Sequence, residues 1–106
     1  MTMFSFLKSL FSKEPPLSEI MEKNPHIIDV RSPAEFRSGH VDGSQNIPLN
    51  QINNHVNRLS KKRVPIVLCC ASGMRSGRAT RILRKHGLEA YNGGGWQQVN
   101  RALERK

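Results

Sequence analysis

The chain has 106 residues, 37% of them hydrophobic and 24% charged, which suits one folded domain with one core. Its formal net charge of +9 at pH 7 indicates an anionic partner, but the basic residues lack interleaved aromatic side chains, so we expect no nucleic-acid binding. The two cysteines are adjacent, which excludes a disulfide framework and favours a reducing, cytoplasmic compartment.

The positive charge is concentrated in the second half of the chain. From Arg58 onward the only acidic side chains are Glu89 and Glu104, whereas twelve are basic: Arg58, Lys61, Lys62, Arg63, Arg75, Arg78, Arg81, Arg84, Lys85, Arg101, Arg105 and Lys106. No group of His and Cys residues has the spacing of a zinc site, and we expect neither a metal nor a cofactor.

Residues 1–16 are predicted to form an apolar N-terminal segment with a linker, and residues 17–106 the folded domain. Five apolar side chains of residues 1–12 fall on one helical face: Met3, Phe4, Leu7, Leu10 and Phe11. The run is far shorter than the roughly 20 residues of a spanning helix. Two interpretations stay open: a docked helix or frayed tail, or an interfacial helix that contacts a membrane surface or a partner.

The rest of the chain alternates short apolar runs with helical patterns. In chain order, the first predicted elements are a short helix from Leu17 to about Asn24, a strand over 26–30, a helix from Pro33 to Gly39 and a strand over 44–49. They are followed by a helix over 49–59, a buried strand over 65–69, a helix over 75–86, a strand over 89–91 and a helix from Trp96 to Leu103. This alternation predicts an α/β fold, with a central parallel sheet, helices on both faces and ligands at the carboxyl ends of the strands.

The most informative segment is residues 66–76, where a buried strand ends in two cysteines and a small-residue turn leads into an arginine-rich helix. If the turn curls around Cys70, its amides and the positive end of the helix favour thiolate over thiol. Gly73 permits the sharp turn, and Arg75 offers a forked guanidinium that suits oxyanions. We therefore predict that Cys70 is a nucleophile. Alternation along the strand turns Cys69 to the opposite side, where we expect it to pack in the core.

Two registers of this loop point to different chemistries. Counted from Cys70, four residues separate the cysteine from Arg75, and a glycine stands three positions after the cysteine. Counted from Cys69, five residues separate the cysteine from the arginine, as in cysteine phosphatases, but Ser72 stands where a glycine is expected. The shorter register fits better.

Three segments together resemble the single-domain form of the rhodanese family of sulfurtransferases. They are Asp29-Val30-Arg31 with Glu35-Phe36 and residues 39–49 (GHVDGSQNIPL), the loop from Cys70 to Ser76, and Tyr91-Asn92-Gly93-Gly94. The match covers roughly Leu17 to Leu103. The resemblance implies a rhodanese-like fold with four parallel strands, or five if the usual first strand of the family is present.

The resemblance also implies a thiosulfate sulfurtransferase. Cys70 would take the outer sulfur of thiosulfate or of a persulfide donor, hold it as a persulfide, and pass it to cyanide or a thiol. The implied donor-binding residues are those of the loop: Ala71, Ser72, Gly73, Met74, Arg75 and Ser76. Of these, Arg75 would orient the anion.

The resemblance further implies that Asp29, Arg31 and Glu35 form a buried charge network behind the loop. The expected partners are a small anionic sulfur donor and a thiol acceptor or sulfur-relay protein. Two alternatives stay open. One is a module that carries or binds a persulfide with little turnover, and the other is a cysteine phosphatase or arsenate reductase that uses the Cys69 register.

Overall fold

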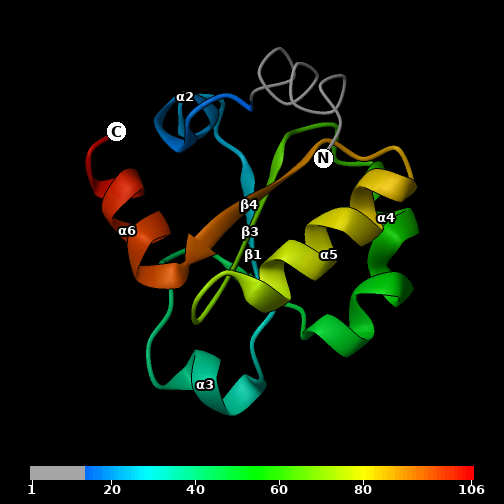
Figure 1. Ribbon diagram of the computed structural model, residues 1–106, viewed down its shortest axis with the longest axis horizontal. Coiled ribbons are helices and arrows are strands. Elements are labelled where there is room, and N and C mark those ends of the chain that lie inside the picture. The colour runs from blue at the N-terminus through cyan, green and yellow to red at the C-terminus, as the bar shows by residue number, and fades with distance from the viewer. Residues whose placement is uncertain (1–13) are drawn as a thin grey trace, which may run out of the picture.

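A four-stranded parallel sheet forms the centre of the molecule in the computed structural model, which describes residues 14–106 (Figure 1). The strand order is β2-β1-β3-β4, with β1 at His26–Asp29, β2 at Gln45–Asn46, β3 at Ile66–Cys70 and β4 at Ala90–Gly95. The predicted α/β class with a parallel sheet is confirmed, and the described residues contain four strands rather than five. The apolar segment of residues 1–12, with both interpretations left open for it, lies outside the described residues.

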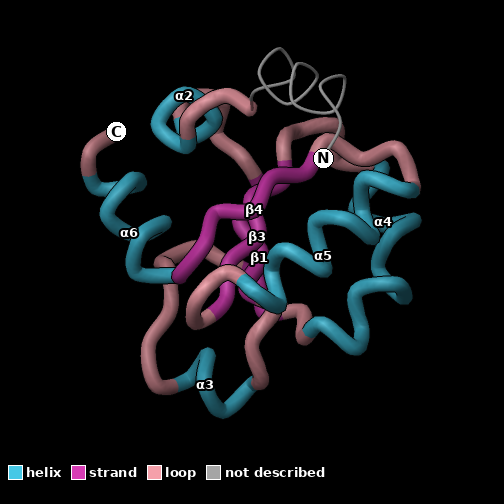
Figure 2. The backbone as a smooth tube through the Cα atoms, viewed as in Figure 1, coloured by secondary structure: helices cyan, strands magenta, loops and turns pink. Residues whose placement is uncertain are grey.

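Helices cover both faces of the sheet, as predicted (Figure 1). One face carries α5 (Met74–Lys85) with η1 (Leu49–His55) and α4 (Val56–Ser60), and the other carries α2 (Leu17–Met21) and α6 (Trp96–Glu104). The short helix α3 (Pro33–Arg37) lies beyond the end of the sheet (Figure 2). None of the helices within residues 14–106 has the length and apolar character needed to cross a membrane.

Alternation along β3 divides the core between the two faces. Leu68 and Cys70 pack in the cluster under α5, and Val67 and Cys69 pack in the cluster under α6. Because successive side chains of a strand point to opposite faces, the two adjacent cysteines occupy different environments. Cys69 therefore packs in the core, as predicted.

Several element boundaries differ from the predictions. The strand predicted over 44–49 shortens to β2, because Pro48 has no N–H for the ladder and the chain turns into η1. The predicted helix over 49–59 begins as the 3-10 helix η1 and becomes α-helical only at Val56. Strand β3 continues through Cys70, which pairs with Gly95.

The largest difference concerns β4. Strand β4 runs through the three glycines to Gly95 instead of ending near Tyr91, because Gly93 lies where the backbone approaches its neighbours closely. A Cβ atom at Gly93 would lie 2.6 Å from Val99 Cγ2 and 2.8 Å from Val67 Cγ1. Glycine therefore lets the strand pass under α6.

We expect Gly93→Ala to lower the free energy of unfolding by about 1–3 kcal/mol, since the added methyl group overpacks this contact. Chemical denaturation measures the change. In the double variant with Val99→Ala, which removes the nearer clash, the loss should be smaller than the sum of the two single losses. Simple additivity would show that the contact with Val99 is not the cause.

Candidate active site

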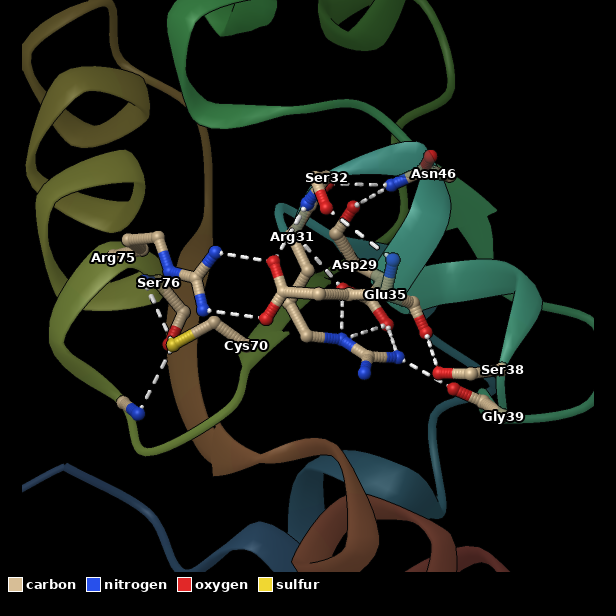
Figure 3. Close-up of polar contacts among 11 residues, drawn as sticks. Asp29, Arg31, Ser32, Glu35, Ser38, Gly39, Asn46, Cys70, Arg75 and Ser76 are labelled. Carbon is tan, nitrogen blue, oxygen red and sulfur yellow. Dashed lines mark hydrogen bonds and ion pairs between the residues drawn. The ribbon is translucent and has the colours of Figure 1, made fainter.

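Cys70 ends β3 at the carboxyl edge of the sheet, and its sulfur lies inside the loop that follows. The amide of Gly73 donates a hydrogen bond to Cys70 Sγ at 3.0 Å, and the amide of Ser76 donates another at 3.4 Å (Figure 3). Gly73 has a φ of 100° and immediately precedes α5, so glycine permits the turn that aims these amides inward. The twelve-residue helix α5 adds its positive end to the same point. The loop therefore forms the cradle that the sequence predicts.

The cradle lowers the pKa of Cys70. Burial alone would raise it, because the residue is 1% exposed. The hydroxyl of Ser76 and the amides of Ser76, Ser72 and Gly73 act in the opposite direction, and together they bring the pKa below its ordinary value. Hydrogen bonds that favour the charged form thus outweigh desolvation, and the sulfur is prepared to react as a thiolate.

Cys69 has the opposite character. Burial, and then the negative charge of Asp29, raise its pKa to about 12. The residue is fully buried on the far face of the sheet, away from the loop amides. It is therefore a neutral core thiol at physiological pH, and the phosphatase register has no nucleophile in the cradle.

The other predicted loop residues lie at the mouth of the cradle. The side chains of Ala71 and Ser72 are exposed, and Met74 is the most exposed large apolar residue of the described part, at 76%. Gly95 of β4 packs against the backbone of Ala71, where a Cβ atom would lie 3.0 Å from the Ala71 oxygen. The loop is thus supported from β4 and open on its outer side.

Asn92 is a site residue that the sequence analysis did not select. Ser76 Oγ lies 3.3 Å from Cys70 Sγ and donates to Asn92 Oδ1 at 2.7 Å. Asn92 Nδ2 donates in turn to the carbonyl of Gly73 at 3.0 Å, so that one side chain ties both ends of the cradle to β4. The predicted strand over 89–91 ends before Asn92, so the sequence carried no signal for this role.

The single hydrogen of the Ser76 hydroxyl links this network to the charge on Cys70. A serine hydroxyl has one hydrogen to donate and two lone pairs to accept with. It can donate to Asn92 while it accepts from the neutral thiol, or it can turn and donate to the thiolate. The Ser76 hydroxyl can therefore form a hydrogen bond with Cys70 both as a thiol and as a thiolate.

We expect Ser76→Ala to raise the pKa of Cys70, because it removes the hydroxyl that stabilises the thiolate. The rate of alkylation by iodoacetamide, followed against pH, should move to higher pH and fall several-fold at neutral pH. Ser60→Ala, at the end of α4 and remote from the cradle, is the matched control and should leave the profile in place. An unmoved profile in Ser76→Ala would contradict this role.

Arg75 does not point into the cradle, although the sequence analysis assigned it to the anion. Its guanidinium forms a two-pronged ion pair with Glu35, with Nη1–Oε1 at 2.7 Å and Nη2–Oε2 at 3.0 Å (Figure 3). Both side chains are 38% exposed. The hydrogen bonds from Arg75, and then from the Ser32 amide, lower the pKa of Glu35 to about 2, so the pair persists across the neutral range.

Glu35 is consequently not part of a buried network, which corrects the prediction. Its backbone amide bonds to Ser32 Oγ at 3.2 Å, and its carboxylate accepts from the Ser32 amide at 3.1 Å, so the two residues cap α3 reciprocally. This cap holds the carboxylate at the helix start, where it meets Arg75. Glu35 therefore ties α3 to the cradle at the surface.

Asp29 and Arg31 do form a buried pair. Their side chains are 0% and 5% exposed, and Arg31 Nη2 lies 2.7 Å from Asp29 Oδ2. Arg31 Nε donates to both carboxylate oxygens, at 2.9 and 3.0 Å, and Nη2 donates to the carbonyl of Gly39 at 2.6 Å. The guanidinium also lies 5.1 Å from the ring centre of Trp96. The pair thus joins the end of β1 to the segment after α3 and to α6.

Within residues 14–106, no cluster of three or more His, Cys, Asp or Glu side chains is arranged to hold a metal ion. What the site presents is an activated thiol, Cys70, with amide donors around its sulfur. Residues 15–102 match the model of the rhodanese-like domain family.

The chain belongs to the rhodanese-like domain family. Thiosulfate sulfurtransferase PspE of Escherichia coli (strain K12) is 33% identical over 76 residues, which make up 70% of this chain and 73% of that protein. A solved structure described as a rhodanese with anions from E. coli is similar at a TM-score of 0.64 and 33% identity, over 70% of this chain and 89% of that one. The uncharacterized protein YqhL of Bacillus subtilis (strain 168) is 44% identical over 71 residues, 66% of this chain but 56% of that protein.

The topology places Cys70 at a position where ligands commonly bind. Cys70 is the last residue of β3, at the carboxyl edge of a parallel sheet, which is where α/β folds bind their ligands. The match fixes the class of protein as rhodanese-like, and one relative, PspE, is named as a thiosulfate sulfurtransferase. The substrates of this chain are a separate question, which the geometry of the cradle addresses.

Proposed function

We propose that this rhodanese is a cytoplasmic sulfurtransferase that moves sulfane sulfur from thiosulfate or a persulfide donor to cyanide or a thiol. The observation that carries the proposal is the contrast between the two cysteines. Amides and a hydroxyl lower the pKa of Cys70 inside the cradle, whereas burial raises that of Cys69 to about 12. Both thiols are free, which fits a reducing compartment.

The reaction needs two displacement steps. In the first, Cys70 Sγ as thiolate bonds to the outer sulfur of the donor, the bond between the two donor sulfurs breaks, and sulfite leaves with the electron pair. In the second, the acceptor bonds to the outer sulfur of the Cys70 persulfide, and Cys70 leaves as thiolate. The loop amides that favour the thiolate also favour the anionic persulfide.

The depth of Cys70 favours sulfur over phosphate as the transferred group. Because the residue is 1% exposed, the attacked atom must enter the cradle. A terminal sulfane sulfur enters as a single atom, whereas a phosphoryl group brings three oxygens that each need a place. Arg75 would orient the oxyanion end of the donor by exchanging its ion pair with Glu35 at the rim for one with the donor.

The second candidate function is a persulfide carrier with little turnover of its own. Two observations favour it: the sulfur of Cys70 is buried, and the guanidinium of Arg75 is already occupied by Glu35. A carrier and an enzyme share the first displacement and differ in the second. They are therefore separated by the rate of discharge to small acceptors.

Treatment with thiosulfate, followed by intact-mass measurement and then by addition of cyanide, tests the proposal. We expect the protein to gain the mass of one sulfur atom, and cyanide to return it to its original mass with formation of thiocyanate. An adduct that cyanide discharges only very slowly would identify the carrier. Hydrolysis of a phosphate ester with no sulfur adduct would contradict both.

A further inference from the structure

Helix α5 presents a row of cations that begins at the mouth of the cradle. The cations are Arg78, Arg81 and Lys85, and the apolar residues Met74 and Ile82 lie on the same side of the helix. We name these five residues, Met74, Arg78, Arg81, Ile82 and Lys85, the α5 stripe. The other four stand four, seven, eight and eleven positions after Met74, so all five share one side of the helix. The three cations are exposed, and with the half-buried Ile82 they line a shallow hollow of about 280 Å³.

The charges of the α5 stripe are not neutralised within the chain. Every Asp and Glu of the sequence lies within residues 14–106, the part that the structure describes. The ion pairs of those residues involve Arg31, Arg75 and Arg84, and none involves a cation of the stripe. The stripe is therefore a positive surface available to an outside partner.

The α5 stripe is too long to serve the sulfur donor alone. At a rise of 1.5 Å per residue, the distance along the helix from Met74 to Lys85 is about 16 Å. A small anion in the cradle has only a few atoms and reaches no further than the first turn of α5. Only a larger ligand, which starts at Cys70 and continues along the helix, would contact the far end of the stripe.

The composition of the stripe favours an acidic polypeptide as that ligand. Cations that surround an apolar floor match a segment with carboxylates on either side of an apolar residue, and Met74 adds an apolar contact beside the cradle. The stripe has no aromatic residue on which a nucleic-acid base could stack. The ligand must also bring a thiol to Cys70, because the persulfide requires an acceptor.

We propose that the α5 stripe is the docking surface for an acidic protein segment that carries the acceptor cysteine. This proposal rests on the proposed function. The thiolate of the acceptor bonds to the outer sulfur of the Cys70 persulfide while the bond between that sulfur and Cys70 Sγ breaks. The electron pair stays on Cys70 as thiolate, so the sulfur moves without any external oxidant or reductant.

Two synthetic peptides test the proposal on the full chain loaded with sulfur from thiosulfate. Each peptide has one cysteine; one has flanking Asp and Glu residues, and the other has Asn and Gln in their place. We expect the acidic peptide to discharge the persulfide about tenfold faster at low ionic strength, and added salt to remove the advantage. Acidic flanks raise the pKa of a thiol and slow its intrinsic reaction, so this effect opposes the expected preference.

The double variant Arg78→Glu/Arg81→Glu should abolish or invert the ratio of the two rates. Arg101→Glu/Arg105→Glu, which makes the same charge change in α6 and just after its end, across the sheet from α5, should retain it (Figure 1). Equal rates for the two peptides on the wild-type protein, or a ratio that survives Arg78→Glu/Arg81→Glu, would overturn the docking surface alone. Failure of thiosulfate to form any sulfur adduct would instead contradict the proposed function and, with it, this inference.

Discussion

Cys70→Ser should reduce the turnover of thiosulfate and cyanide by about a thousandfold or more, and Cys69→Ala should retain most of it. The first variant replaces the thiolate that forms the persulfide with a hydroxyl that stays protonated at neutral pH. The second removes a core thiol whose pKa is raised to about 12 and which the loop amides do not reach. Thiocyanate production, measured per mole of folded protein, gives both rates.

Alanine is the better replacement at Cys69, because serine would place an unpartnered hydroxyl in the core. Circular dichroism establishes that each variant is folded before its rate is measured. Loss of activity in Cys69→Ala with retention in Cys70→Ser would reverse the assignment. It would also support the loop register counted from Cys69, which is typical of cysteine phosphatases.

Asp29→Asn should lower the free energy of unfolding by about 3–5 kcal/mol. The substitution leaves the buried guanidinium of Arg31 without its counter-charge and replaces one of the two acceptor oxygens with an NH2 group that cannot accept. A single domain of this size is stable by about 5–15 kcal/mol, so the loss is a large fraction of the total. Urea denaturation measures it.

Two further variants make the test of this pair specific. Asp42→Asn changes an exposed aspartate and should shift stability by no more than about 0.5 kcal/mol. The double variant Asp29→Leu/Arg31→Met removes both charges and should be more stable than Asp29→Asn, because no unpaired charge stays buried. Equal losses in the double variant and in Asp29→Asn would show that the charge of Arg31 is not the cause.

The sequence was sufficient for those features that depend on neighbouring residues. The adjacent cysteines fall on opposite faces because a strand alternates, and α3 begins at Pro33 as predicted. The loop after Cys70 is likewise a local motif, in which Gly73 sets the turn. Alternating apolar runs and helical patterns were enough to predict the parallel sheet.

The features that the sequence did not reveal depend on contacts between distant segments. Glu35 and Arg75 are 40 positions apart, and only the approach of α3 to α5 gives the arginine a partner at the rim. Asn92 reaches Ser76 and Gly73 because β4 lies beside β3, which places its side chain next to the loop. The course of β4 through Gly93 depends on how closely α6 packs.

The central claim is that Cys70 carries the transferred sulfur, and the most direct measurement is the position of that sulfur on the wild-type chain. The protein is treated with thiosulfate, alkylated and digested, and the peptide that contains both cysteines is fragmented between them in a mass spectrometer. We predict that the extra sulfur lies on Cys70 and that Cys69 carries none. Extra sulfur on Cys69, or no sulfur on either residue, would contradict the account.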